Sequence, residues 1–200
     1  MSTLGEVKAR IADELNRTDL DSQIGAAITR AIRTHGAKRF WFLEARQTQT
    51  VTAEDEYVNL PSGTRNIDLI QVQIGETWYP LCKVSLAAMD DLKGMNVSEG
   101  QPTDYAVEKT RLRLYPTPDQ AYTLSLIGTF DLTLADDSDT NAWTTEAEDL
   151  IVATVKKHIC RDIIIDETRA MLCQGAETEA LNLLQDETVR RLSTGIRPCL

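Results

Sequence analysis

The segment Arg39-Phe40-Trp41-Phe42-Leu43-Glu44 leads directly into the polar stretch Gln47-Thr48-Gln49-Thr50-Val51-Thr52. The first segment closes a region of helical apolar spacing, and the second has the composition of a β-strand. Three consecutive rings, Phe40, Trp41 and Phe42, cannot all face one core in a helix or a strand, because neighbouring side chains diverge in both. We therefore predict a junction between two structural layers. Two interpretations stay open: a hinge within the core, which is usual for aromatic runs, or an interface used in assembly.

Apolar residues at helical spacing stand before this run. Leu4, Val7, Ile11 and Leu15 predict a helix over residues 3–16, and the spacing from Ile24 to Ile32 predicts a second over 21–37. The break between them is short and polar, so we expect an antiparallel pair.

Helical spacing returns near the carboxyl end. Thr145 and Glu148 have the form of a capping box with Trp143 as its hydrophobic staple, which predicts a helix as far as about Ile165. A last helix is predicted from the apolar residues between Cys173 and Leu192.

The middle of the chain has strand patterns. The clearest is 122–134, where apolar residues alternate with Thr123, Ser125, Thr129, Asp131 and Thr133, which predicts a strand with one solvated face. Other predicted elements are a hairpin of 48–52 with 56–60, strands at 67–74 and 78–81, a short helix capped by Ser85, and a hairpin of 105–108 with 111–115.

This order of elements predicts an α+β fold. Terminal helices with one-sided apolar stripes need a common partner, and the economical arrangement packs them together with an inserted antiparallel β region. The predicted division is a helical bundle of 1–46 and 143–192, a β-rich insert of 47–142 with one short helix, and a flexible tail of 193–200.

Charge is unevenly distributed over the 200 residues, whose net charge is −10. Residues 131–150 contain seven acids and no Lys or Arg. Such a surface repels DNA, which argues against a nucleic-acid-binding regulator. Solubility alone explains the acids, and a surface that lies near DNA without adhering to it is the functional alternative. Charges among the first twenty residues and the lack of an apolar run of about 20 residues predict synthesis in a reducing cytoplasm and no membrane partner.

Reactive groups are not concentrated anywhere in the sequence. Motifs for nucleotide binding, serine hydrolysis and zinc hydrolysis are missing. His35 is predicted to be a solvated residue at a helix end, and His158 is predicted to pair with Asp162 one turn away. The cysteines, Cys82, Cys160, Cys173 and Cys199, have no CxxC spacing and are predicted to be free buried thiols, with Cys199 loose in the tail. We predict no catalytic, cofactor or metal site.

An ordered set of segments resembles the head-to-tail adaptors, or connectors, of tailed bacteriophages and gene transfer agents. Each segment is weakly specific, and the resemblance lies in their order over about residues 4–192. The segments are Glu14-Leu15-Asn16-Arg17, Lys38-Arg39-Phe40-Trp41-Phe42-Leu43-Glu44, Glu56-Tyr57-Val58-Asn59-Leu60-Pro61, Gly100-Gln101-Pro102-Thr103-Asp104-Tyr105-Ala106-Val107, Leu112-Arg113-Leu114-Tyr115-Pro116-Thr117-Pro118-Asp119 and Trp143-Thr144.

The resemblance implies a structural role in the virion. It implies a ring of about twelve copies beneath the portal protein, which joins the DNA-filled capsid to tail or stopper proteins while genomic DNA passes through the channel. It also implies that the tail binds the portal, through Ser193, Thr194, Gly195, Ile196, Arg197, Pro198, Cys199 and Leu200.

Two alternatives remain open at this point. One is another virion connector, such as a head-completion or tail-terminator protein. The other is a small hydrolase that uses His158 with an acidic partner, which the sparse supply of histidine disfavours.

Overall fold

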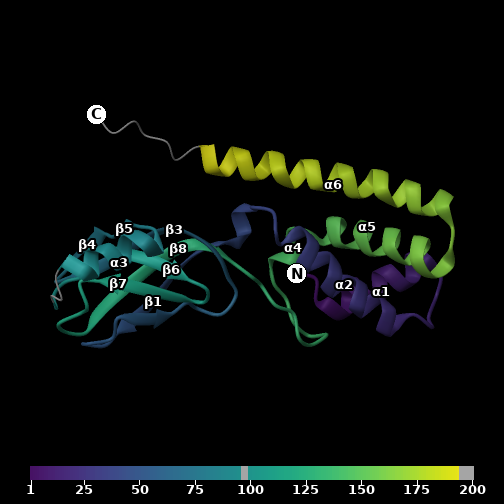
Figure 1. The fold of residues 1–200 in the computed structure, drawn as a ribbon. Coiled ribbons are helices and arrows are strands. Elements are labelled where there is room, and N and C mark those ends of the chain that lie inside the picture. The colour runs from purple at the N-terminus through teal and green to yellow at the C-terminus, as the bar shows by residue number, and fades with distance from the viewer. Residues whose placement is uncertain (96–98, 194–200) are drawn as a thin grey trace. The chain divides into compact units, whose positions relative to one another are not determined.

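The protein forms two compact units in a computed structural model, which describes residues 1–95 and 99–193 (Figure 1). The helical unit comprises Met1–Leu43 and Leu132–Leu200, and the β unit comprises Glu44–Asp131. The two terminal helical regions pack together, with two β-sheets inserted between them in the chain, so the predicted α+β class is confirmed. The predicted domain limits at 46 and 143 stay predictions, and the division in the structure falls after Leu43 and after Asp131.

One apolar core holds the helical unit together. The helix α5 (Glu148–Ile159) lies at its centre and packs against four other α-helices. The fully buried side chains of this core include Ile11, Trp143, Leu150 and Val155. The other elements are α1 (Leu4–Leu15), α2 (Asp21–His35), the 3-10 turn η1 (Trp41–Leu43), α4 (Ala142–Thr145), the π-helical turn η2 (Cys160–Ile164) and α6 (Glu167–Ser193).

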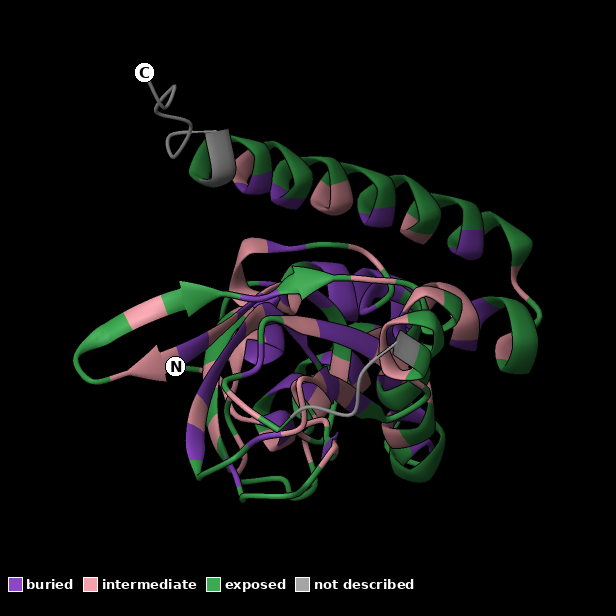
Figure 2. Cartoon of the chain, turned by 60° about the vertical axis from the view of Figure 1, so that its left-hand side comes forward, coloured by how far each residue is buried: buried purple, intermediate pink, exposed green. Residues whose placement is uncertain are grey.

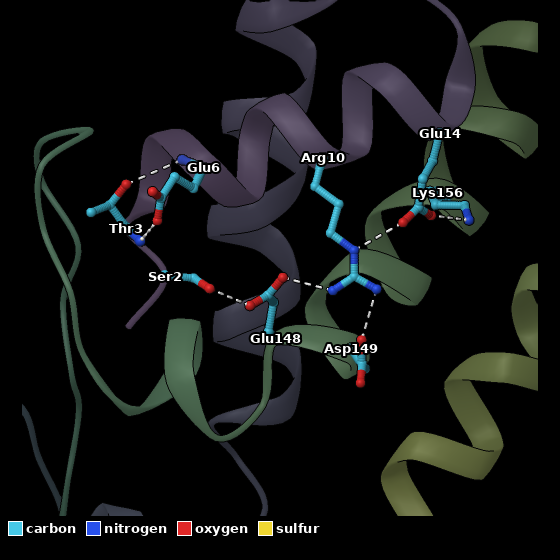
Figure 3. A network of polar contacts seen from close by, with 8 residues as sticks. All are labelled: Ser2, Thr3, Glu6, Arg10, Glu14, Glu148, Asp149 and Lys156. Atoms are coloured by element: carbon cyan, nitrogen blue, oxygen red, sulfur yellow. Dashed lines mark hydrogen bonds and ion pairs between the residues drawn. The ribbon is translucent and has the colours of Figure 1, made fainter.

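The predicted stripe of α1 is the face that it buries. Leu4, Val7, Ile11 and Leu15 are all buried. Thr3 caps the helix by accepting a hydrogen bond from the backbone N–H of Glu6, whose carboxylate accepts one from the N–H of Thr3 in return (Figure 3).

The predicted capping box at Thr145 and Glu148 is wrong. The structure places a capping box one turn earlier, where Asn141 caps α4 together with Thr144. The helix α5 begins after Ala147, which has no side chain able to cap. The predicted end near Ile165 is confirmed, because Ile165 caps the helical region in the left-handed conformation (φ 58°), but its last turn, η2, is a π turn.

The β unit contains two four-stranded sheets that share one buried cluster. In order across the first sheet the strands are β1 (Glu44–Val51), β8 (Tyr122–Phe130), β3 (Thr64–Ile74) and β4 (Thr77–Pro80). Across the second they are β2 (Tyr57–Asn59), β7 (Arg111–Tyr115), β6 (Asp104–Glu108) and β5 (Cys82–Lys83). The helix α3 (Leu86–Met95) follows β5, and the hydroxyl of Ser85 caps it as predicted, by accepting from the N–H of Ala88. Pairing is antiparallel except between β5 and β6.

Strand partners were predicted correctly in one hairpin and wrongly in the other. The hairpin of β6 with β7 is confirmed. The predicted hairpin of 48–52 with 56–60 is wrong, because β1 pairs with β8 and β2 pairs with β7. Val51 and Val58 both enter the cluster between the sheets, but each does so from a different sheet.

The central strand β8 differs from its prediction in length and in exposure. It ends at Phe130, and Leu132 and Leu134 pack instead against the core of the helical unit. Ser125 and Thr129 are buried, so the predicted solvated face is wrong at these positions. Ser125 lies between Thr48 of β1 and Gln71 of β3, and a short side chain in a central strand is shielded by such longer cross-strand neighbours.

Candidate assembly surface of the helical unit

The aromatic run belongs to the core of the helical unit. Phe40 stacks on Phe42 with ring centroids 5.2 Å apart, and Trp143 meets both rings edge-on at 5.9 and 5.2 Å. Trp41 meets Phe42 edge-on at 5.1 Å. The expectation that one ring must leave this core assumed a helix or a strand. Residues 41–43 form a 3-10 turn instead, whose different side-chain directions allow all three rings to pack against the same core.

The last turns of α6 reach this cluster. The guanidinium carbon of Arg191 lies 4.6 Å from the ring centroid of Trp41, which is the geometry of a cation–π contact worth about 0.5–1 kcal/mol at an exposed site. Phe40 is fully buried, whereas Trp41 and Phe42 are half-buried. Whether the exposed part of these rings serves in assembly stays a prediction.

A buried polar cluster joins α2, α5 and α6. His35 Nε2 lies 3.0 Å from Thr154 Oγ1 and 3.4 Å from Glu177 Oε1. The hydroxyl of Thr154 lies 3.1 Å from the same carboxylate oxygen, and the ammonium of Lys157 pairs with the other oxygen. His35 is only 3% exposed, so the prediction of a solvated histidine is wrong. The cluster fixes the middle of α6 against α2 and α5.

The environment sets the charges in this cluster. Burial lowers the pKa of His35, although the nearby carboxylate of Glu177 favours the charged ring. His35 Nδ1 is buried without a hydrogen-bond partner among the described residues, so a second ring proton would be an unpaired buried donor. Burial opposes ionisation of Glu177, but Lys157 and Thr154 outweigh it and the pKa of this carboxyl is lowered. The cluster therefore holds a neutral imidazole beside an ammonium–carboxylate pair.

Acid should weaken the helical unit through His35. Its pKa is lower when folded than the unfolded value of about 6.5, so the unfolded chain binds more protons and stability falls as pH drops below that value. The limiting slope is about 1.4 kcal/mol per pH unit for one proton. Urea unfolding at pH 7.5 and 5.5 measures the decrease in the free energy of unfolding. This decrease should be smaller in His35→Gln than in the wild type. Burial also lowers the pKa of His158, so His158→Gln serves as the comparison. An equal loss in wild type and His35→Gln would contradict the assignment.

Arg10 is the centre of a polar network between α1 and the start of α5 (Figure 3). Its guanidinium donates to Glu148 at 2.6 Å, to Asp149 at 2.9 Å and to Glu14 at 2.9 Å. Lys156 donates to the other oxygen of Glu14 at 2.6 Å. Single exposed pairs contribute about 0–1 kcal/mol, but this network shares three carboxylates and also positions α1 along α5.

A groove of about 430 Å³ lies beside this network, between α1, α5 and α6. Its apolar part includes Leu150, Ala153, Ala176, Leu183 and Leu184, and its polar part includes Arg10, Glu14, Glu146, Asp149, Lys156 and Glu179. The side of α6 that faces α5 is buried or half-buried, whereas the rest of its surface is exposed (Figure 2). Exposed apolar side chains on α6 are Met171 (69%), Leu172 (72%), Leu183 (65%) and Val189 (65%).

The sequence matches the family model described as "SU10 adaptor protein" over residues 2–198. The chain belongs to the SU10 adaptor protein family. This is a family of phage head-to-tail adaptors, so the resemblance stated from the sequence is confirmed. No match was found among curated proteins.

Membership of the SU10 adaptor family makes this a phage structural protein and implies that it is not an enzyme. Over residues 1–95 and 99–193, no group of three or more His, Cys, Asp or Glu side chains is placed to hold a metal ion. None of the described helices has the length and apolar character needed to cross a membrane.

The predicted pairing of His158 with Asp162 in this SU10 adaptor forms no hydrogen bond or ion pair among the described residues, although the charge of Asp162 opposes the burial that lowers the pKa of His158. Asp162 instead accepts from Arg161 at 2.7 Å and lies 3.4 Å from Arg30. His158 Nδ1 lies 3.4 Å from Arg161. The π turn begins at Cys160, between the two residues, and changes the one-turn spacing on which the pairing depended.

The predicted portal-binding tail lies almost wholly outside the described residues. Ser193 ends α6, and residues 194–200 are not described. Their role in this SU10 adaptor stays a prediction. Among the cysteines, Cys160 is buried as predicted and Cys173 is half-buried, whereas Cys82 is exposed on β5 at the edge of its sheet.

The acids between residues 131 and 150 are partly neutralised. Asp137 pairs with Lys8 at 2.6 Å, and Glu148 and Asp149 pair with Arg10. Asp139 accepts hydrogen bonds from the backbone N–H groups of two residues in its own loop. Much of this acidic stretch therefore holds α1 and the loop in place, which the run of like charges in the sequence did not reveal.

Sequence reasoning missed Glu177 and the groove. One signal for Glu177 was present, because a charged residue stands at core spacing between Ala170 and Leu184, which are both buried. The groove depends on the spacing between three helices, and no local pattern encodes that distance.

Proposed function

We propose that this SU10 adaptor forms a ring of about twelve copies beneath the portal at the head–tail interface of the virion, and there joins the capsid to tail or stopper proteins. The observation that carries the proposal is the family match over residues 2–198. The surface of α6 supports it, because Met171, Leu172, Leu183 and Val189 are exposed apolar residues on one helix. These side chains are spaced along the helix, and a partner protein that lies along α6 would cover them.

Genomic DNA would pass through the channel of this ring. The net charge of −10 supports passage without adhesion, since binding to phosphates requires Lys and Arg that replace counterions. Asp136 belongs to the 131–150 stretch and forms no ion pair within the part of the chain that the structure describes, so it is a candidate for the channel surface. This function predicts weak, salt-insensitive affinity for DNA.

The tail of 193–200 would bind the portal. The helix α6 has 27 residues and spans about 40 Å, so it carries the start of this tail well away from its buried beginning near Ala170. A short segment at the end of a rigid helix can engage a partner without rearranging the bundle.

Removal of the residues after Leu192 should abolish portal binding and leave the fold intact. The measurement is co-sedimentation with the portal protein of the same phage, together with a thermal melt of each chain. A chain with residues 193–200 in scrambled order is the matched control for length and charge, and it should also fail to bind. If the truncated chain binds the portal as the full chain does, the role assigned to the tail is wrong.

A further inference from the structure

The lining of the groove carries more negative than positive charge. Four carboxylates and two cations line it. The cations are already engaged, because Arg10 binds three carboxylates and Lys156 binds Glu14. Glu146 and Glu179 are both exposed and have no ion pair in the described residues. The groove therefore presents unpaired negative charge beside apolar side chains.

A second surface of the helical unit has the opposite charge. Residues 22–43 include Arg30, Arg33, Lys38 and Arg39 and contain no Asp or Glu. Ala26, Arg30 and Arg33 lie at helical spacing on one exposed face of α2. Arg33 is exposed and has no ion pair among the described residues, and Arg30 has only its 3.4 Å contact with the half-exposed Asp162. We call Ala26, Arg30 and Arg33 the α2 face.

The α2 face borders a shallow hollow that can accept an apolar side chain. The hollow has a volume of about 280 Å³, and its lining includes Ala26, Ala27 and Ile163, which is 42% exposed, together with Arg30, His158 and Asp162. In the groove, Leu183 projects with 65% of its surface exposed. One surface thus offers acids around an exposed leucine, and the other offers Arg30 at the hollow and Arg33 one turn further along α2.

The two surfaces have no lining residue in common. A head-to-tail contact between identical subunits requires two such separate and complementary surfaces, and a contact of this kind closes into a ring when the rotation allows. We propose that the groove between α1, α5 and α6 of one copy receives the α2 face of a second copy. The proposal rests on the proposed function, because it names the contact that would build the ring.

The tail of the same chain is a less suitable occupant of the groove. Residues 193–200 contain one cation, Arg197, whereas the α2 face presents two cations beside small residues. Charge complementarity therefore favours a second copy, and the experiment distinguishes the two occupants.

Charge reversal on each surface tests the contact. The groove variant carries Glu146→Arg and Glu179→Arg, and the α2 variant carries Arg30→Glu and Arg33→Glu. Each variant places like charges across the contact, so we expect each to weaken self-association by about 100-fold or more. The full chain is studied by sedimentation velocity over a range of concentrations at low salt. A control with Glu76→Arg and Asp91→Arg, both exposed in the β unit, matches the charge change of the groove variant.

Mixing the two variants gives the sharpest result. The reversed groove of the groove variant fits the reversed α2 face of the α2 variant. The unchanged α2 face of the groove variant fits the unchanged groove of the α2 variant. An equimolar mixture should therefore assemble with alternating copies, while each variant alone stays monomeric and the control behaves as wild type. Rescue by mixing also shows that both variants are folded.

Four outcomes would overturn the proposal. They are a wild type that is monomeric at every concentration, variants that assemble as the wild type does, a mixture that stays monomeric, and self-association that is lost on truncation after Leu192 but not in the α2 variant. The last would place the tail in the groove. A full chain that fails to bind the portal would contradict the proposed function instead, so the two failures are distinguishable.

Discussion

Trp143→Ala should lower the free energy of unfolding of the helical unit by about 3–5 kcal/mol. Trp143 is 1% exposed, and its ring contacts both Phe40 and Phe42 edge-on. Truncation removes the largest fully buried side chain of the unit and leaves the two stacked phenylalanines without their partner. A loss of this size is a large share of the 5–15 kcal/mol that stabilises a typical domain.

Trp143→Phe is the matched control for this variant. It keeps an aromatic ring in the cluster and leaves a smaller cavity. The free energy of unfolding should therefore fall clearly less than in Trp143→Ala. Urea unfolding followed by circular dichroism measures both. A loss below about 1 kcal/mol for Trp143→Ala would show that the aromatic cluster does not stabilise the unit as argued.

Gly128→Ala should have the largest effect in the β unit, a loss of about 3 kcal/mol or more. A Cβ atom at this position would lie 2.1 Å from the carbonyl oxygen of Asn66 and 3.1 Å from the Cα of Ile67. These are backbone atoms of β3, at the place where its register with β8 shifts. They cannot move aside as a flexible side chain can, so the two strands must separate.

Gly94→Ala is the comparison for the same chemical change in the same unit. Gly94 lies in α3, and a Cβ there would meet nothing within 4 Å. Alanine should be tolerated or should stabilise the helix by up to about 1 kcal/mol. Equal tolerance of alanine at positions 128 and 94 would contradict the close approach of β3 to β8.

Local patterns predicted most elements because those elements are stabilised by neighbours in sequence. The stripe from Leu4 to Leu15 needs only the 3.6-residue period to be recognised, and all four of its residues are buried. The hairpin of β6 and β7 closes through a tight turn at Lys109, which has a positive φ of 56°. The α+β class followed from the order of such elements, and the family followed from the order of short motifs.

Distant pairing could not be predicted in the same way. Val51 pairs with Tyr122 on β8, although a closer candidate strand follows β1 directly in the sequence. The choice depends on which strands together cover the shared cluster, and turn signals do not encode it. His35 was misplaced for a related reason, because it is buried by α5 and α6, which follow it in the chain by more than a hundred residues.

In the candidate surfaces, too, some features are visible in the sequence and others only in the structure. The aromatic run and the acidic stretch were visible in the sequence, but the 3-10 turn at residues 41–43 and the ion pairs of Arg10 were not. The cations of residues 22–43 were visible as residues, yet their significance depends on a groove of opposite charge that three helices form together.

The central claim is that this chain acts by binding copies of itself and a portal protein. Native mass spectrometry of the full chain, alone and with the portal of the same phage, tests it most directly. We expect the portal assembly to gain a complete ring of bound copies, with a mass that corresponds to a fixed number of chains. A portal assembly whose mass is unchanged by excess chain would contradict the claim.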